Sequence, residues 1–187
     1  MTTVELSTDY LVIGSGTTGM AFADVIVQES DFDIIIVDMH GQPGGHWNDA
    51  YPFVTLHQPS TFYGVSSLPL GNNRLAQHGF NEGMGELATG AEVTAYFEQV
   101  MRTQLLPSGR VRYFPKCRYT GEGQFESMLT GQKYHVTASA RTVDATALNS
   151  NNFGVGVNNF GVGVKTPTGV FTPTPNIRNP NIDAARS

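Results

Sequence analysis

The sequence predicts an α/β fold in which helices cover a parallel β-sheet, and three observations carry this prediction. Residues 9–13 form a short apolar run that is typical of a buried strand. A glycine-rich turn follows, and residues 17–29 then place apolar side chains at helical spacing. Residues 33–38 form a second apolar run of strand length. Strand, helix and strand in this order predict a βαβ unit, in which the two strands are parallel.

The turn between the first strand and the helix reads G-x-G-x-x-G over residues 14–19. In this context Gly14 permits the tight turn, Gly16 lets the backbone approach a pyrophosphate, and Gly19 lets the helix pack close to the strand. Thr17 and Thr18 open the helix, where unpaired N–H groups and the helix dipole favour a phosphate. The sequence therefore predicts a Rossmann-like dinucleotide-binding domain. A glycine-rich turn without a ligand is the alternative interpretation.

An acidic residue, Asp38, ends the second strand and lies 19 positions after Gly19. This is the interval expected for the carboxylate that accepts hydrogen bonds from the adenosine ribose. A carboxylate here would repel a 2′-phosphate, so the sequence predicts FAD or NAD at this site rather than NADP. The fingerprint alone does not distinguish FAD from NAD.

The segment that follows Asp38 supplies five further candidate cofactor contacts. They are Met39, Gly44, Gly45, His46 and Trp47. Two glycines after a proline allow a sharp turn and a close approach of the backbone to a ligand. Trp47 offers a flat surface and one N–H donor, although a core aromatic residue is an equal interpretation. The surrounding region, residues 40–90, is long, irregular and rich in glycine and proline, which favours a functional loop.

Four further elements complete the expected fold. A capping box at residues 89–92 precedes a second helix over residues 91–106, which Pro107 and Gly109 end. Residues 111–114 predict a third strand. Short alternating segments between residues 117 and 140, including 125–129 and 134–138, predict a β-meander inserted into the domain. Residues 141–146 then predict a separate strand that returns to the parallel sheet.

At this point the sequence resembles a known family. The glycine turn at 14–19, Asp38 and the G-G-x-W sequence at 44–47 are together similar to the FAD-binding half of flavin-containing monooxygenase-like oxidoreductases, which have two dinucleotide-binding domains. The resemblance covers residues 1–148, which we expect to form the FAD/NAD(P)-binding domain. It implies that the G-G-x-W segment wraps the flavin side of FAD.

The resemblance also implies which side chains border the isoalloxazine ring. These are His46, His57 and Gln58, which lie in or after the G-G-x-W segment. Further along the chain, the family places the main chain near Cys117 against the adenine. It places Ala145 and Thr146 near the phosphates, although the family has a glycine where this chain has Ala147.

Three functions remain open on the sequence. The resemblance implies an NAD(P)H-dependent flavin monooxygenase acting on a small-molecule substrate. Enzymes of that kind carry a second G-x-G-x-x-G domain and a late acidic residue at the flavin, neither of which is visible in these 187 residues. We therefore expect a truncated form, which would need a second chain or domain as its partner for turnover. The alternatives are a non-enzymatic FAD- or NAD-binding module and an inactive remnant. No catalytic acid–base pair is predicted.

Composition narrows the remaining classes of function. The net charge is −5 with 14% charged residues, so no basic patch for nucleic acid is expected. Cys117 is the only cysteine, and the five histidines lack metal-binding spacing, which excludes a disulfide framework and predicts no metal site. The first residues do not resemble a signal peptide, and no apolar run reaches the roughly 20 residues that span a bilayer. We expect a cytoplasmic protein without a membrane partner.

The last part of the sequence departs from a domain pattern. The heptapeptide NNFGVGV occurs at residues 151–157 and again at 158–164, and a stretch rich in proline, threonine and asparagine follows. Two copies are too few to bury a continuous core, which takes about three repeats. We expect residues 149–187 to form a low-complexity, disordered tail.

Overall fold

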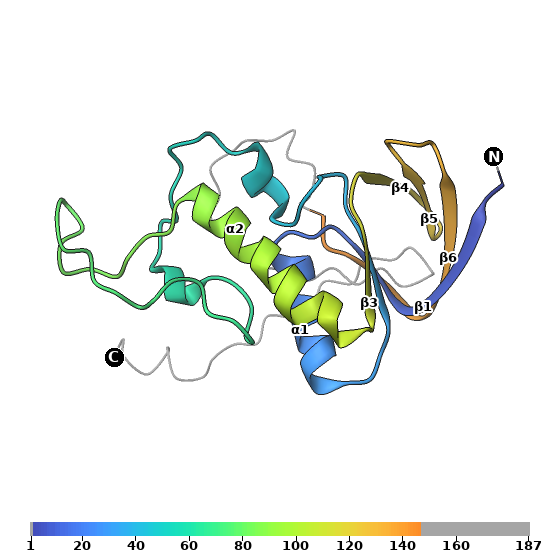
Figure 1. Ribbon diagram of the computed structural model, residues 1–187, viewed down its shortest axis with the longest axis horizontal. Helices are drawn as coiled ribbons and strands as arrows, with labels where there is room; N and C mark the ends of the chain where they lie inside the picture. The colour runs from blue at the N-terminus through green and yellow to red at the C-terminus, as the bar shows by residue number, and fades with distance from the viewer. Residues whose placement is uncertain (1, 147–187) are drawn as a thin grey trace, which may run out of the picture.

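The computed structural model describes residues 2–146 and shows the predicted α/β, Rossmann-like fold (Figure 1). Its six-stranded sheet has the order β3-β2-β1-β6-β5-β4. The strands β3, β2, β1 and β6 are parallel, and β4 and β5 form an antiparallel hairpin beside β6. The strand bounds are β1 Val4–Ile13, β2 Ile34–Val37, β3 Val111–Phe114, β4 Cys117–Gly121, β5 Gln124–Ser127 and β6 Lys133–Asp144. The expected domain end at residue 148 and the tail, 149–187, lie outside the described residues.

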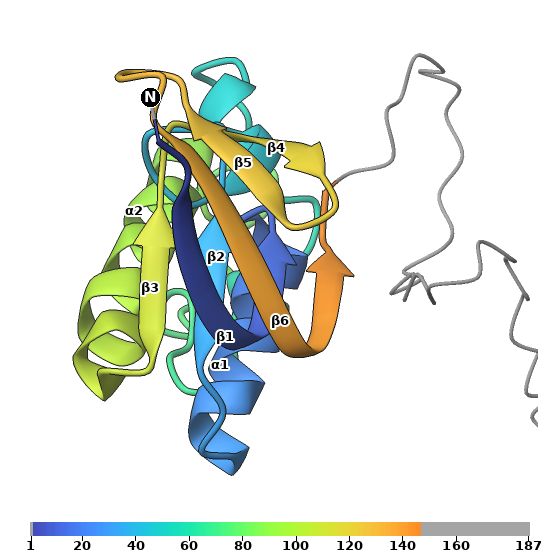
Figure 2. The same ribbon diagram turned by 90° about the vertical axis from the view of Figure 1, so that its right-hand side faces the viewer.

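The domain has three layers, which are the helices, the parallel strands and the β4–β5 hairpin. Side chains of a strand alternate between the two faces of the sheet, so each parallel strand contributes to both cores. Val12, Ile34 and Ile36 face the helices α1 (Thr17–Glu29) and α2 (Gly90–Val100), which lie against the same face. Leu11 and Ile35 face the opposite way, where the β4–β5 hairpin covers them with apolar and aromatic side chains. Figure 2 shows the parallel strands between the helices and this hairpin. Burial on both faces explains why β2 reads as an unbroken apolar run.

Helix α1 begins and ends where the sequence predicted, but two of its residues differ from the expected pattern. Val25, which we expected on the apolar surface, is 41% exposed. Its neighbour Asp24 is instead fully buried. Asp24 Oδ2 accepts a hydrogen bond of 3.0 Å from the Ser67 main-chain N–H, and the Ser67 hydroxyl donates to Asp24 Oδ1. The buried side of α1 therefore includes an acidic residue whose hydrogen-bond partner comes from a distant loop.

Helix α2 has the predicted capping box. The Thr89 hydroxyl accepts from the Glu92 main-chain N–H, and the Glu92 carboxylate accepts from the Thr89 main-chain N–H. The α-helical geometry ends at Val100, earlier than expected, and continues as a π-helical turn η3 (Met101–Leu105) and a 3-10 turn η4 (Leu106–Ser108). Gly109 then adopts φ +73°, which ends the helical segment in the left-handed conformation that glycine favours.

Strand β6 corrects two predictions. The meander strand 134–138 and the returning strand 141–146 are one continuous strand, which pairs in parallel with a β1 that begins at Val4 rather than Asp9. The register shifts once, because Thr8 pairs with Ala138 whereas Tyr10 pairs with Arg141. This β-bulge puts one extra residue into β6 and breaks the alternation of the sequence, which is why it read as two strands.

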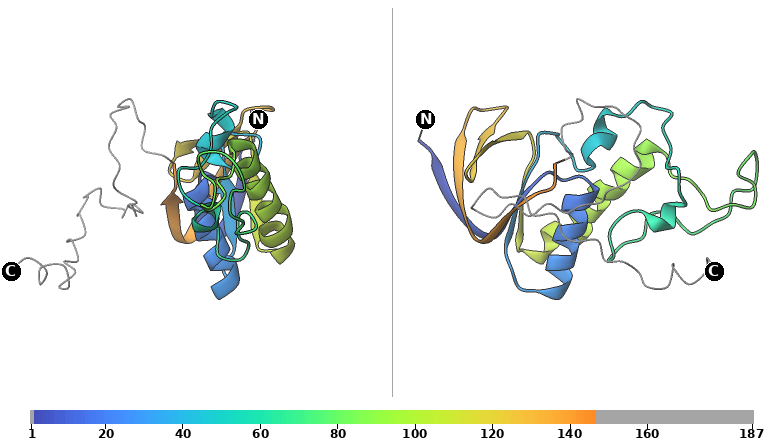
Figure 3. Two further views of the ribbon diagram at one scale, coloured as in Figure 1. Left: turned by 90° about the vertical axis from the view of Figure 1, so that its left-hand side faces the viewer. Right: turned by 180° about the vertical axis from the view of Figure 1, so that it is seen from behind.

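The long segment between β2 and α2 is irregular, as predicted, with two short 3-10 turns, η1 (Gly45–Asp49) and η2 (Ser60–Phe62). Its central part is fixed to α2 by the Tyr96 hydroxyl, which donates to Leu68 O over 2.6 Å and accepts from Val65 N over 2.7 Å. Figure 3 shows the part around residues 70–86 extending away from the body. Within residues 2–146, no helix has the length and apolar character that crossing a membrane takes.

Candidate functional site

The predicted glycine turn lies at the carboxyl end of β1, where ligands of parallel sheets bind. Gly14 has φ +100°, and a Cβ placed on it would lie 3.1 Å from Ala145 O. A Cβ on Gly19 would lie only 2.0 Å from Gly14 O. A side chain at either position would therefore require strain or a shift of the main chain, and the two glycines bring the start of α1, the end of β1 and residue 145 into direct contact.

The second glycine of the turn packs against the G-G-x-W segment. A Cβ on Gly45 would lie 2.8 Å from Gly16 Cα, and Gly45 has φ +55°. The two loops are also joined by a hydrogen bond of 2.9 Å from Gly44 N to Ser15 O. Two motifs whose contacting residues are 29 positions apart in the sequence thus form one backbone surface.

The first turn of α1 presents N–H groups that have no partner within the helix. Gly16 is its N-cap and offers no side chain to satisfy them, and the turn contains no acidic residue. Thr17 is partly buried and Thr18 is exposed. A helix N-terminus of this kind is suited to an anion, since the unpaired N–H groups and the dipole act together.

Asp38 is almost completely buried and uses both carboxylate oxygens within the protein. Oδ2 accepts from Ser15 N over 2.5 Å and from Ser15 Oγ over 2.8 Å. Oδ1 accepts from His40 N over 2.7 Å and lies 2.9 Å from His40 Nδ1. The Tyr113 hydroxyl lies 3.3 Å from Ser15 Oγ, and burial raises the pKa of Tyr113, so this hydroxyl stays protonated and can donate to the serine. These bonds fix the carboxylate against the glycine turn.

His40 lies between two carboxylates, although no sequence pattern singled it out. Its Nδ1 faces Asp38 and its Nε2 lies 2.8 Å from Asp49 Oδ2. Burial alone would lower the pKa of His40, but hydrogen bonds to Asp49 and Asp38 and their negative charges outweigh it and raise the pKa above its ordinary value. Both ring nitrogens can donate at once only in the protonated ring.

Trp47 and Tyr63 link the G-G-x-W segment to the start of α1. Trp47 Nε1 donates to the Tyr63 hydroxyl over 2.6 Å, and that hydroxyl is also hydrogen-bonded to the Thr17 hydroxyl. Trp47 packs against the main core while remaining partly exposed, so it has features of both interpretations that the sequence left open. Tyr63 was missed in the sequence, since only the fold brings it to Thr17.

We expect the change Tyr63→Phe to destabilise the domain by about 1–2 kcal/mol, because two hydrogen bonds are lost while the ring is kept. Denaturant unfolding followed by the fluorescence of Trp47, the single tryptophan, would measure this. Tyr51→Phe is the control, since Tyr51 is 57% exposed and should leave the unfolding midpoint unchanged. Equal midpoints for both variants would contradict a structural role for the Tyr63 hydroxyl.

The other predicted residues fall into two groups, those that contact the glycine turn or Asp38 and those that lie more loosely around them. Ala145 and Thr146 lie at the site, where Ala145 N donates to Ile13 O over 2.9 Å and a Cβ on Gly19 would lie 3.4 Å from Ala145 Cβ. The main chain of Cys117 also lies there, because its N–H donates to Asp38 O over 2.9 Å. Burial raises the pKa of the Cys117 thiol.

The second group is more loosely connected to the turn. Met39 is 54% exposed beside Asp38. The ring of His46 is tilted against Trp47, with 5.1 Å between centroids, and desolvation lowers the pKa of His46 against the charge of Asp49. In the described part of the chain, His57 and Gln58 are exposed and their side chains make no hydrogen bond. Their predicted place at the flavin stays a prediction.

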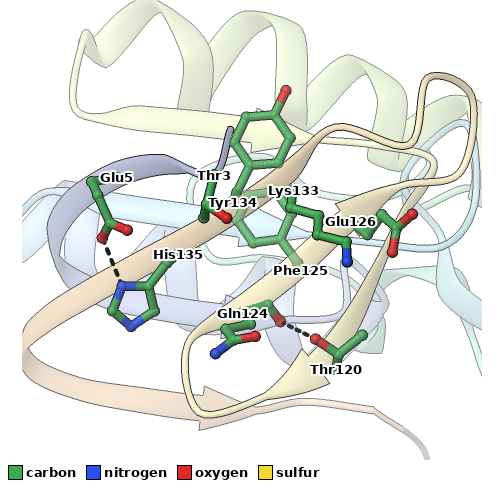
Figure 4. A pocket seen from close by; sticks show the side chains of 9 residues that line it. All are labelled: Thr3, Glu5, Thr120, Gln124, Phe125, Glu126, Lys133, Tyr134 and His135. Carbon is green, nitrogen blue, oxygen red and sulfur yellow. Dashed lines mark hydrogen bonds and ion pairs between the residues drawn. The ribbon is translucent and has the colours of Figure 1, made fainter. Parts of the chain in front are cut away.

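A hollow of about 480 Å³ lies elsewhere in the domain (Figure 4). It is lined from β1, β4, β5 and β6, and it contains the pair His135 Nδ1 and Glu5 Oε2 at 2.7 Å. Glu5 lies near the amino end of β1, whereas the glycine turn follows the carboxyl end. We place the candidate site at the glycine turn, because ligands of parallel sheets bind at the carboxyl ends of the strands.

Comparison with known proteins relates this chain to a domain family and to solved structures. Residues 12–78 match the NAD(P)-binding Rossmann-like domain family. Uncharacterized proteins of Mycobacterium tuberculosis and Mycobacterium bovis are 52% identical to this chain over 145 residues, which are 78% of this chain and 27% of each relative. The chain therefore spans little more than a quarter of the length of these relatives.

Solved structures show the same fold. A flavin-containing monooxygenase from Stenotrophomonas maltophilia is 22% identical with a TM-score of 0.51, and the match covers 75% of this chain and 38% of the monooxygenase chain. An oxidized steroid monooxygenase bound to NADP is also 22% identical with a TM-score of 0.51, and the match covers 75% of this chain and 26% of the monooxygenase chain. Residues 12–78 are thus similar to the NAD(P)-binding Rossmann-like domain family, and the described part of the chain has the Rossmann-like fold that these monooxygenase structures share.

Proposed function

We propose that this chain binds FAD as the dinucleotide-binding part of an oxidoreductase of the NAD(P)H-dependent flavin monooxygenase type. One observation carries the proposal. The segments 14–19, 38–47 and 145–146 meet at the carboxyl edge of the parallel sheet, around an uncapped helix N-terminus and a buried carboxylate. These are the parts that a dinucleotide needs for its pyrophosphate and its ribose.

Each segment has a distinct role in this proposal. The N–H groups at Thr17, Thr18 and Gly19 hold the pyrophosphate, and Asp38 accepts from the adenosine ribose. The segment 44–47 lies on the flavin side. When bound, FAD supplies the redox chemistry, and the protein orients it and excludes competing reactions. NAD(P)H as reductant and a small-molecule substrate are further parts of the proposal.

A dinucleotide-binding module without turnover is the second candidate. It is favoured by the fact that, within residues 2–146, all assigned contacts belong to one nucleotide-binding unit. Such a module takes FAD, or NAD in its place, and needs a further chain or domain to handle NAD(P)H.

Reconstitution with excess FAD followed by gel filtration tests the proposal. We expect the purified chain to retain flavin absorption bands. Adding NADH or NADPH anaerobically then distinguishes the candidates, because bleaching of the bound flavin indicates an oxidoreductase and unchanged bands indicate a binding module. Protein that leaves the column colourless, and that retains NAD instead, would contradict the FAD assignment.

A further inference from the structure

We propose that the His40 side chain is a gate on the dinucleotide site, which must release the carboxylate of Asp38 before the ribose can bind. The inference rests on the proposed function and adds a residue that controls it. It arises from the number of hydrogen bonds that Asp38 already accepts.

The carboxylate of Asp38 has no acceptor position left in this structure. A carboxylate accepts about four hydrogen bonds, two on each oxygen. Ser15 provides two donors to Oδ2, and His40 provides two to Oδ1. A ribose hydroxyl that binds Asp38 must therefore displace one of these four donors.

Only one of the four donors is free to leave. The main-chain N–H of Ser15 is fixed because Gly44 N donates to Ser15 O, and that of His40 is fixed because Lys116 N donates to His40 O over 2.9 Å. The Ser15 hydroxyl is fully buried beside Tyr113. The His40 ring is different, since its side chain is 25% exposed and its second partner, Asp49, has a side chain that is 73% exposed. The ring can turn outward with Asp49 and leave Oδ1 to the ribose.

The charges around His40 couple the gate to protonation. Asp38 faces the ring from the end of β2 and Asp49 faces it from η1. Lys116, in the turn between β3 and β4, is the neighbouring cation, with its Cε 3.2 Å from the position that a Cβ on Gly41 would take. The protonated ring donates to both carboxylates, whereas the neutral ring donates to only one. Opening the gate removes one carboxylate partner and so favours the neutral ring.

This coupling gives the sign of the pH dependence. The pKa of His40 is raised in the free protein and falls when the ring loses Asp38, so binding releases a proton. Affinity for the dinucleotide then rises as pH increases through the range between the two pKa values and levels off above the higher one. The higher value lies above the ordinary 6.5 of histidine.

Isothermal titration calorimetry of the full chain with FAD, in two buffers of different ionisation enthalpy between about pH 5.5 and 8.5, tests the gate. For the wild type we expect release of up to about one proton per FAD and an affinity that rises up to about tenfold per pH unit in the coupled range. His40→Ala should bind at low pH more tightly than the wild type, with no proton release.

His135→Ala is the matched control, because His135 also pairs with a carboxylate, that of Glu5, but far from the glycine turn. It should keep the wild-type pH profile. Weaker binding of His40→Ala at every pH, with a flat wild-type profile, would show that His40 positions Asp38 and would overturn the gate while leaving FAD binding intact. Absence of FAD binding by the wild type and by both variants at every pH would refute the proposed function and the gate together.

Discussion

The change Gly19→Ala is expected to abolish FAD binding and to lower the free energy of unfolding by about 1–3 kcal/mol. The new Cβ would lie 2.0 Å from the main-chain oxygen of Gly14, which cannot move as a side chain would. Helix α1 must shift away from β1, and its N-terminal N–H groups shift with it. Gel filtration with FAD and thermal unfolding measure the two effects. Val25→Ala, on the exposed side of α1, is the control that should keep both.

Substitutions at Gly16 distinguish packing from access of the pyrophosphate. A Cβ on Gly16 would lie 3.4 Å from Gly45 Cα, an ordinary contact, so Gly16→Ala should fold and retain FAD. Gly16→Val adds two methyl groups to a Cβ that already lies 3.4 Å from Gly45 Cα, and we expect it to lose FAD. If a folded Gly16→Ala protein also loses FAD, the alanine methyl blocks the pyrophosphate itself, as the sequence motif predicted. Unchanged affinity in a folded Gly16→Val protein would refute the site.

The sequence was most informative where local pattern and tertiary contact agree. The bounds of α1 were predicted because apolar spacing and the glycine turn mark the same start. The cap of α2 was predicted because both halves of a capping box lie within four residues, 89–92. Strand β3 was predicted because its apolar residues follow the stop at Gly109. In each case the interactions that fix the element are close in the chain, so a short window contains them.

Contacts between distant segments were the ones that the sequence did not reveal. Tyr63 reaches Thr17 across 46 positions, and Asp24 reaches Ser67 across 43. An acidic residue on an apolar helix face reads as exposed until its partner is known. His40 was passed over for a similar reason, since its two partners become significant only when Asp38 is seen to be buried and fully hydrogen-bonded.

Asp24→Ala is expected to destabilise the domain by about 2–4 kcal/mol, because it removes a buried carboxylate acceptor and leaves two donors of the partly buried Ser67 unpaired. Asp24 is fully buried, and both of its carboxylate oxygens accept from Ser67. Denaturant unfolding at neutral pH measures the loss. Asp31→Ala removes an exposed acid from the segment after α1 and should leave stability unchanged. Equal stabilities of the two variants would show that the Asp24 contact contributes nothing.

The Asp24 contact also reaches the site, because Ser67 follows Tyr63 in the loop that touches the first turn of α1. Asp24→Ala should therefore weaken FAD binding without changing any residue at the cofactor. A double-mutant cycle with Ser67→Ala separates this effect from general loss of stability. If the Ser67 hydroxyl acts only through Asp24, Ser67→Ala should cost little in the Asp24→Ala background, whereas additive losses would place the two residues in independent roles. Coupling would mean that a buried acid on α1 holds the loop in the position where Tyr63 meets Thr17 and Trp47.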